Sequence, residues 1–385
     1  MARIRAVEII EAGAAVALDW DDGGRRRFHA IWLRDSALDP ATRAPGNGQR
    51  LISVLDVPEA TRIERAWLDD AGGLGLRFAP DGKETGFPAA WLAAHCYDRP
   101  MQRGPGWTAP GVVRWGGELQ GGLPCLDLGR AAGDRAALAG WLAALRSHGV
   151  ALMGGVPLES GAVCRVAELF GFVRETNYGR WFDVRAEVAP VNLAYTSLGL
   201  QAHTDNPYRD PAPTLQLLAC LENSAEGGHS LVVDGFMACD LLQQEAPDAF
   251  ALLAGHCARF EYAGTAGVRL RARRPMIELA PDGELVAVRF NSRSMAALLD
   301  VPYDTMARYY EAYRRFARII ERPELAVAFK LEQGQLFMVD NTRVLHSRTA
   351  FSGAGSRWLQ GCYADKDGLL STLAALEEGL AEAAE

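Results

Sequence analysis

The sequence lacks the features that mark several special classes of protein. Its seven cysteines are scattered, and no two have the CxxC spacing of a zinc or redox site, which is typical of free thiols in a reducing cytoplasm. No apolar run approaches the roughly 20 residues of a membrane-spanning helix, and no apolar signal segment follows the N-terminus. The net charge of −8 argues against nucleic acid as a partner, because nucleic-acid-binding proteins usually carry a basic face. We therefore expect a cytoplasmic protein that binds neither membranes nor nucleic acids.

The 385 residues are enough for two domains, and turn signals divide the chain near residue 97. Residues 1–97 contain short alternating or apolar stretches, such as Leu51–Val57, separated by turns, which predicts a small β-rich domain. Residues 98–122 are rich in glycine and proline and predict a linker that lies on the surface. Residues 123–385 are expected to form the second domain.

The second domain combines helical and extended patterns. Arg135–His148 has apolar residues at helical spacing, whereas Leu215–Leu221, Gly334–Val339 and Trp358–Tyr363 are apolar runs typical of strands. These patterns predict a fold that is mainly β with flanking helices, in the α+β class. A double-stranded β-helix, or jelly roll, is the architecture we expect, because it brings side chains from distant strands together between two sheets.

Two distant segments carry side chains that suit a metal ion. His203 and Asp205 are two residues apart before an apolar stretch, so on a strand their side chains would share a face. His346 follows another apolar stretch and supplies a second imidazole. Each histidine by itself is more often structural than a ligand. Together, two histidines and one carboxylate form the set that binds Fe(II) on one face and leaves positions open for other ligands.

Arg357 lies eleven residues after His346, where its guanidinium could bind a carboxylate through two hydrogen bonds. An open iron site beside such a group suggests an enzyme that uses 2-oxoglutarate and dioxygen and forms succinate and CO2 as co-products. The cofactors would then supply the chemistry, and the protein would orient the substrate. An alternative from another class is a non-catalytic small-molecule binding protein, which a broken set of metal ligands would favour.

Sequence motifs in both domains resemble those of one enzyme family. The second domain carries Asn192-Leu193-Ala194-Tyr195-Thr196, His203-Thr204-Asp205, Leu215-Gln216-Leu217-Leu218, Glu226-Gly227-Gly228, Val233-Asp234-Gly235-Phe236, Asp340-Asn341-Thr342-Arg343-Val344-Leu345-His346 and Gln360-Gly361-Cys362-Tyr363-Ala364-Asp365. The first domain carries Trp32-Leu33-Arg34-Asp35 and Trp91-Leu92. With these motifs the chain resembles the γ-butyrobetaine dioxygenase branch of the taurine-dioxygenase-like Fe(II)/2-oxoglutarate oxygenases over nearly its whole length. The resemblance also implies a homodimer.

The resemblance implies a small trimethylammonium substrate held by aromatic rings, because a quaternary ammonium group cannot donate hydrogen bonds. The matching positions are Tyr178, Phe182, Tyr195 and Tyr363, and Trp181 is a further candidate. For each of these rings, packing in the hydrophobic core is the alternative reading. One further aromatic position of the family falls on Asn206 here, and Leu218 matches a residue whose backbone touches the oxo acid.

Relatives on this branch usually carry a zinc site in the small domain. The corresponding positions here are Ala37, Asp39, Thr42 and Lys83. None of them can serve as the thiolate or imidazole that such a site needs. We therefore predict no structural zinc.

The anionic end of the substrate is the second departure from the family pattern. By resemblance it meets Asn192 and the segment Asn291, Ser292, Arg293 and Ser294, with Arg180 as a further charge. An arginine together with amide and hydroxyl groups suits the three oxygens of a phosphonate better than a carboxylate.

This pattern is similar to that of the trimethylaminoethylphosphonate hydroxylases. It favours hydroxylation of 2-(trimethylammonio)ethylphosphonate next to phosphorus. The alternative is γ-butyrobetaine hydroxylation, which forms L-carnitine. An Arg293 that points to solvent or pairs with Asp300 would weaken the argument for the phosphonate.

Overall fold

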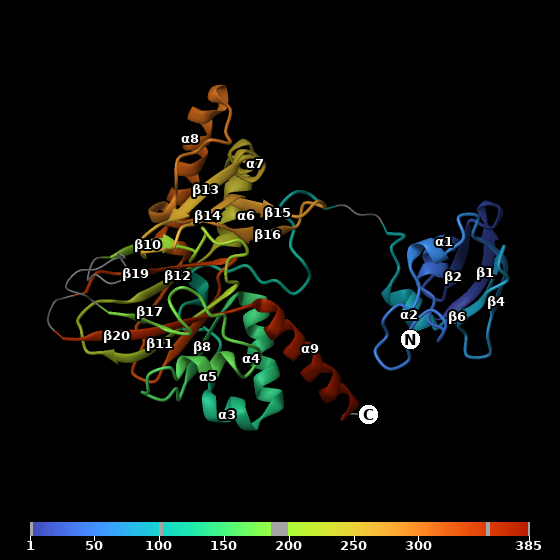
Figure 1. Ribbon diagram of the computed structural model, residues 1–385, viewed down its shortest axis with the longest axis horizontal. Coiled ribbons are helices and arrows are strands. Elements are labelled where there is room, and N and C mark those ends of the chain that lie inside the picture. Colours follow the sequence, from blue (N-terminus) through green and yellow to red (C-terminus); the bar gives the residue numbers. More distant parts are fainter. Residues whose placement is uncertain (1–2, 100–102, 186–198, 352–354, 384–385) are drawn as a thin grey trace. The chain divides into compact units, whose positions relative to one another are not determined.

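The computed structural model describes residues 3–99, 103–185, 199–351 and 355–383, and the chain forms two compact units (Figure 1). The first unit is Met1–Gln102 and the second is Arg103–Glu385. The boundary therefore lies inside the segment 98–122 that we expected to be a linker.

The first unit contains two three-stranded antiparallel sheets that pack around one core. The core includes Trp20, Phe28, Leu33, Phe78 and Phe87. The elements are β1 (Ile4–Ile10), β2 (Ala15–Trp20), β3 (Arg25–His29), α1 (Ala30–Asp35), β4 (Arg62–Leu68), β5 (Leu74–Ala79), β6 (Glu84–Phe87) and α2 (Ala89–Ala94). No strand forms at Leu51–Val57, where the structure has a 3₁₀ turn at Val54–Asp56 whose apolar side chains are exposed.

Residues 103–122 belong to the second unit rather than to a surface linker. The Trp115 side chain is 2% exposed, and its indole Nε1 donates a hydrogen bond to the His148 carbonyl at 2.6 Å. The Trp115 amide donates to Asp234 Oδ2 at 3.2 Å. A large aromatic residue in this glycine-rich segment thus anchors it in the core, which the composition alone did not indicate.

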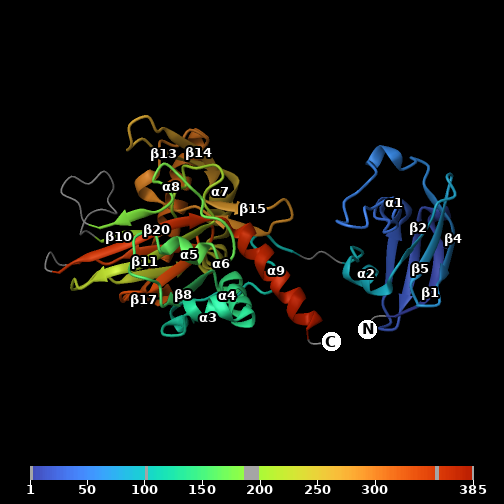
Figure 2. The same ribbon diagram turned by 60° about the horizontal axis from the view of Figure 1, so that its bottom comes forward.

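The second unit is built on two sheets, which confirms the predicted jelly roll. The larger sheet has the order β7-β8-β18-β11-β20-β9, and the smaller has the order β10-β19-β12-β17. Figure 2 labels β8, β11 and β20 of the larger sheet and β10 and β17 of the smaller one. All pairs are antiparallel except β7 with β8. The strands are β7 (Cys125–Asp127), β8 (Val150–Gly154), β9 (Phe182–Val184), β10 (Leu200–His203), β11 (Leu215–Asn223), β12 (Ser230–Asp234), β17 (Ala326–Phe329), β18 (Leu336–Asp340), β19 (Val344–Arg348) and β20 (Arg357–Ala364).

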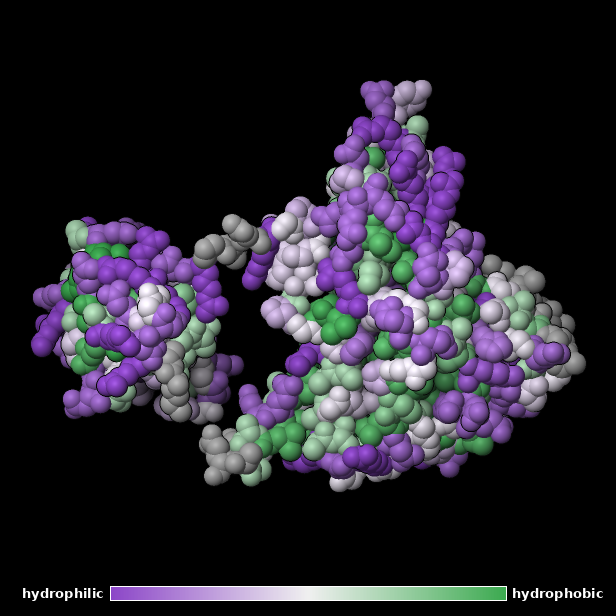
Figure 3. All heavy atoms as spheres, turned by 180° about the vertical axis from the view of Figure 1, so that it is seen from behind, coloured by the Kyte–Doolittle hydropathy of each residue, from purple (hydrophilic) through white to green (hydrophobic). Residues whose placement is uncertain are grey.

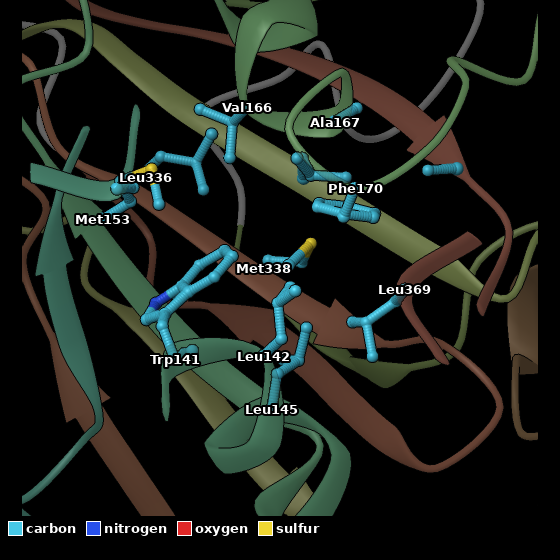
Figure 4. Close-up of a cluster of buried hydrophobic side chains, with 14 of the residues drawn as sticks. Trp141, Leu142, Leu145, Met153, Val166, Ala167, Phe170, Leu336, Met338 and Leu369 are labelled. Atoms are coloured by element: carbon cyan, nitrogen blue, oxygen red, sulfur yellow. The ribbon is translucent and has the colours of Figure 1, made fainter. Parts of the chain in front are cut away.

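Helices cover the outer face of the larger sheet. They are α3 (Leu128–Gly133), α4 (Arg135–His148), α5 (Val163–Ala167) and α9 (Lys366–Glu382). Figure 4 shows Trp141, Leu142 and Leu145 of α4 beside Met338 of β18 in this layer. Because successive strand residues face opposite ways, the alternate residues of β11, such as Leu218, face the smaller sheet instead. The site lies between the two sheets.

A further layer is inserted between β12 and β17. It consists of α6 (Gly235–Glu245), α7 (Pro247–Gly255), β13 (Cys257–Tyr262), β14 (Leu270–Pro275), β15 (Ile277–Leu279), β16 (Leu285–Val288) and α8 (Tyr303–Ile320). These elements share a core that includes Phe250, Phe260 and Phe316. Hydrophilic residues gather on the solvent side of the projecting end that holds α8 (Figure 3). Among the described helices, none is both long enough and apolar enough to span a membrane.

Candidate active site

His203, Asp205 and His346 converge at one point. One ligating atom from each lies within 4.8 Å of the others, and among the described residues this is the group of three that could hold a metal ion. His203 Nε2 is 3.3 Å and His346 Nε2 is 3.9 Å from Asp205 Oδ1. The two histidines are direct cross-strand partners on β10 and β19. Sheet pairing therefore joins residues that are far apart in the sequence.

Asp205 reaches this point by a different route from the one we expected. It lies just after β10, not on it, and the next residue, Asn206, has a left-handed backbone with φ 52°. Asn341 fixes the turn: its Oδ1 accepts from the Asp205 amide at 2.6 Å, and its Nδ2 donates to the Asp205 carbonyl at 2.9 Å. The Asn341 side chain thus pairs with the Asp205 backbone as a neighbouring strand would. Strand alternation does not explain the shared face of His203 and Asp205.

The Asp205 carboxylate is held in one orientation by two donors. Gln216 Nε2 donates to Oδ2 at 2.5 Å, and Tyr363 Oη donates to the same oxygen at 2.9 Å. This leaves Oδ1 directed at the two histidines. Burial alone would raise the pKa of Asp205, but His203 and His346 outweigh it and hold the pKa well below its ordinary value. The carboxyl group is therefore an anion at neutral pH, as a metal ligand must be.

The two imidazoles also fit the requirements of a metal site. His203 Nδ1 lies 2.8 Å from the Gln201 carbonyl, which can only accept a hydrogen bond, so Nδ1 donates and Nε2 is the ring atom directed toward Asp205. Burial and the neighbouring His203 lower the pKa of His346 to about 3, so its ring is neutral at neutral pH. Two imidazoles and one carboxylate are the donor set for Fe(II) in oxygenases of the facial-triad type. The residues present thus fit the predicted metal.

Two buried arginines line the pocket that begins at this triad. Arg357 is the first residue of β20, and Arg348 lies two residues after His346 on β19, so it shares the His346 face. Burial lowers the pKa of both guanidinium groups to about 10, and both stay charged at neutral pH. Leu218 lines the same pocket. The two arginines give the pocket that contains the triad a positive charge. This charge suits 2-oxoglutarate, which carries a carboxylate at each end.

Gly228 makes room for the Arg357 side chain. Its φ is 66°, and a Cβ built there would lie 3.0 Å from Arg357 Cδ and 3.1 Å from Arg357 Nε. Ordinary Cβ contacts are longer, so a side chain at this position would displace the guanidinium. Gly228 of the Glu226-Gly227-Gly228 motif therefore leaves the space that the Arg357 side chain occupies.

Gly228→Ala is expected to raise the KM for 2-oxoglutarate about ten- to a hundredfold, because a misplaced guanidinium loses charge-assisted hydrogen bonds. Steady-state kinetics with varied 2-oxoglutarate measure this. Gly267→Ala is the matched control, since Gly267 has φ 77° and nothing lies within 4 Å of a Cβ there. Equal KM values for the two variants would contradict the role of Gly228.

Aromatic rings form one wall of the pocket. Tyr178, Phe182 and Tyr363 all line it, as the resemblance implied. Phe182 lies 5.1 Å from Tyr363 and 6.0 Å from Tyr178 between ring centroids. Tyr208 and Tyr262 extend this group: the Tyr178 and Tyr208 hydroxyls are 2.9 Å apart, and Tyr208 stacks on Tyr262 at 5.1 Å.

Other proposed contacts of the substrate fall elsewhere. Trp181 is 38% exposed and does not line the pocket, although its ring lies beside Gly161. Asn192 and Tyr195 lie outside the described residues. Arg180 is half-exposed and pairs with Glu168, away from the pocket lining.

Of the four residues at 291–294, the structure brings Arg293 to the pocket that contains the triad. Arg293 is exposed at its rim and also lines an adjoining hollow with Asn291 and Ser294. Asp300 binds Arg259 and Arg273 instead, each at 2.6 Å. Among the described residues, Arg293 makes no ion pair of its own.

The amide and hydroxyl groups nearby are already bonded. Asn291 Nδ2 donates to the Thr204 carbonyl at 3.0 Å, and Asn291 Oδ1 accepts from the Ser294 amide at 3.2 Å. Ser292 Oγ lies 2.7 Å from Tyr313 Oη and faces away from the pocket. Asn291 and Ser292 therefore stabilise the turn that presents Arg293.

Three of the four positions that match the family's zinc ligands, Asp39, Thr42 and Lys83, form a polar cluster in the first unit. Lys83 Nζ lies 2.8 Å from Asp39 Oδ1, and Thr42 Oγ1 donates to Asp39 Oδ2 at 3.0 Å. Ala37 is fully buried beside them in sequence. An ammonium group occupies one carboxylate oxygen of Asp39, and a zinc-free first unit stays our prediction.

The chain is similar to several known proteins. Residues 117–363 match the family described as "Taurine catabolism dioxygenase TauD, TfdA family". Gamma-butyrobetaine dioxygenase of Pseudomonas sp. (strain AK-1) is 37% identical over 94% of each chain. Mitochondrial trimethyllysine dioxygenase of Bos taurus is 31% identical over 90% of this chain and 82% of that protein. A crystal structure of asparagine oxygenase has a TM-score of 0.48 and 20% identity over 60% of this chain and 78% of that one.

The family match spans more than half of the chain, and the bacterial relative is similar along almost all of it. The predicted enzyme class and its two cofactors, Fe(II) and 2-oxoglutarate, are confirmed by this similarity together with the intact triad. The chain is an Fe(II)/2-oxoglutarate-dependent dioxygenase and belongs to the TauD, TfdA family, on its γ-butyrobetaine dioxygenase branch.

Proposed function

We propose that the enzyme hydroxylates a small trimethylammonium zwitterion. The observation that carries this proposal is the aromatic wall of Tyr178, Phe182 and Tyr363 in the pocket that contains the triad. Ring faces attract a quaternary ammonium ion, which offers no hydrogen-bond donor. Arg293, at the rim of the same pocket, supplies a cation for the anionic end. Fe(II), 2-oxoglutarate and dioxygen supply the oxidising chemistry, and the protein holds the two ends of the substrate so that the bond to be attacked faces the triad.

γ-Butyrobetaine is the first candidate substrate, and its hydroxylation would form L-carnitine. The similarity to γ-butyrobetaine dioxygenase supports it more strongly than any other substrate. A single exposed guanidinium is sufficient to receive one carboxylate.

2-(Trimethylammonio)ethylphosphonate is the second candidate, which the sequence pattern favoured. The supporting observation is that Arg293 borders the triad pocket and is not paired with Asp300, and the exposure of its side chain at the rim counts against the phosphonate. A phosphonate gains more from a guanidinium than a carboxylate does, because it carries up to two charges on three oxygens. Because Asn291 and Ser292 already make hydrogen bonds within the protein, the argument for the phosphonate rests on Arg293.

Purified enzyme with Fe(II), 2-oxoglutarate and each candidate in turn tests the proposal. Succinate release and mass spectrometry of the product are measured together, so that coupled hydroxylation is separated from futile turnover. We expect succinate release to depend on substrate for at least one of the two compounds. The compound with the larger kcat/KM shows whether the anionic group of the preferred substrate is a carboxylate or a phosphonate. Absence of hydroxylated product from both would overturn the proposed function.

Arg293→Met is expected to raise the KM for the preferred zwitterion about tenfold, with a larger effect for the phosphonate than for the carboxylate. Methionine keeps the length of the side chain and removes the charge. Arg308→Met is the control, because Arg308 is exposed on α8 and lies outside the pocket. An unchanged KM for both compounds would show that Arg293 does not receive the anion.

The cytoplasmic location and the homodimer stay predictions from the sequence. Sedimentation velocity of the purified chain measures whether it is a homodimer.

A further inference from the structure

Gly361 occupies an inward position of β20 where its neighbours carry side chains. Arg357, Leu359 and Tyr363, at alternate positions of the same strand, all line the pocket. Gly361 pairs with Phe182 of β9 on one side and with Leu218 of β11 on the other. The strand therefore presents bare backbone at the point where the aromatic wall and the 2-oxoglutarate end of the pocket meet.

The Phe182 ring fills the space that a side chain at Gly361 would need. A Cβ built on Gly361 would lie 2.5 Å from Phe182 Cζ, 2.6 Å from Phe182 Cε2 and 2.9 Å from Leu218 Cδ2. Cβ atoms essentially never approach other heavy atoms within 3.0 Å, so the ring lies directly over the glycine. The Gly361 backbone is not in the left-handed region, so steric exclusion and not backbone strain is the constraint.

We propose that Gly361 is a specificity-determining residue, whose missing side chain sets the depth of the aromatic wall for a group as large as trimethylammonium. This inference rests on the proposed function. With any side chain at 361, the Phe182 ring must move away from the sheet and into the pocket, because backbone lies behind it. The space between Phe182 and Tyr363 then shrinks, and the three methyl groups fit less well than two.

The test compares the trimethylammonium substrate with its dimethylamino analogue, which has the same anionic end. The measured quantity is the ratio of their kcat/KM values. We expect the ratio to favour the trimethylammonium compound in the wild type and to fall at least about tenfold in Gly361→Ala. The double variant Gly361→Ala/Phe182→Leu should recover the ratio of Phe182→Leu alone, because the smaller side chain removes the two shortest contacts. The remaining contact, with Leu218 Cδ2, is with the end of a flexible side chain that can shift.

Gly154→Ala is the matched control. Gly154 lies on β8 of the same sheet, and nothing lies within 4 Å of a Cβ built there. Its ratio should equal that of the wild type. Melting temperature and 2-oxoglutarate binding are measured for every variant, so that loss of folding is separated from loss of specificity.

The outcomes distinguish the two levels of the proposal. Turnover by the wild type with an unchanged ratio in Gly361→Ala overturns the inference and leaves the proposed function standing. Turnover of neither compound by the wild type overturns both. A crystal structure of Gly361→Ala provides a second readout: we expect the Phe182 ring displaced toward the pocket, and a ring in its original place would refute the steric argument.

Discussion

His346→Ala is expected to reduce turnover of every substrate by at least about three orders of magnitude, because the metal then keeps one imidazole and one carboxylate. His346 lies opposite His203 in the strand pairing, and its Nε2 is 3.9 Å from Asp205 Oδ1. No other described histidine, aspartate, glutamate or cysteine stands in this group to replace it. The iron content after gel filtration should fall from about one to near zero per chain.

His95→Ala is the control for this experiment. His95 is exposed in the first unit, where its ring stacks on Trp91. Turnover and iron content should match the wild type. A His346→Ala variant that kept more than about a tenth of wild-type turnover would contradict the assignment of His346 as a ligand.

Arg343→Met is expected to lower the unfolding free energy of the second unit by about 3–5 kcal/mol, the cost of leaving a buried charge without its partner. Arg343 and Asp234 are both almost completely buried. Arg343 Nε and Nη2 donate to the two oxygens of Asp234 at 2.9 and 2.7 Å, and Nη1 donates to the Ser147 carbonyl at 2.7 Å. Asp234 also accepts from the Trp115 amide. The pair thus joins β12, the residue that precedes β19, α4 and the segment 103–122.

Denaturant unfolding with a tryptophan signal measures this loss. Arg343→Met/Asp234→Leu should recover part of the stability, because both charges are then removed together. The recovery should be incomplete, since Asp234 also accepts from the Phe236 amide at the start of α6. If Arg343→Met lowered the free energy of unfolding by less than about 1 kcal/mol, the pair would not be important for stability.

The metal ligands could be predicted from the sequence because few residue types bind Fe(II) and both segments flank apolar runs. The residues that orient these metal ligands could not be predicted from the sequence. Gln216 and Asn341 stand in recognisable motifs, but their roles depend on the turn at Asp205, which no local pattern specified. The place of Arg348 in the pocket could have been predicted, because it lies two residues after His346 and strand alternation places both on one face.

The fold shows the same division between periodic and irregular segments. The helix expected at Arg135–His148 forms with those bounds, because its apolar stripe packs on the larger sheet. Leu51–Val57 looked like a strand by composition, yet Leu51, Val54 and Leu55 are exposed. Ser53 and Asp56 form a capping box there, with Ser53 Oγ accepting from the Leu55 amide at 3.2 Å. The local capping signal outweighed the apolar run.

A crystal structure with Mn(II) in place of Fe(II) and with 2-oxoglutarate, grown without oxygen, tests the central claim most directly. The account predicts one anomalous peak, bonded to Nε2 of His203, Nε2 of His346 and Oδ1 of Asp205, with 2-oxoglutarate extending from it toward Arg357. A metal bound elsewhere, or one that omits any of these three side chains, would contradict it.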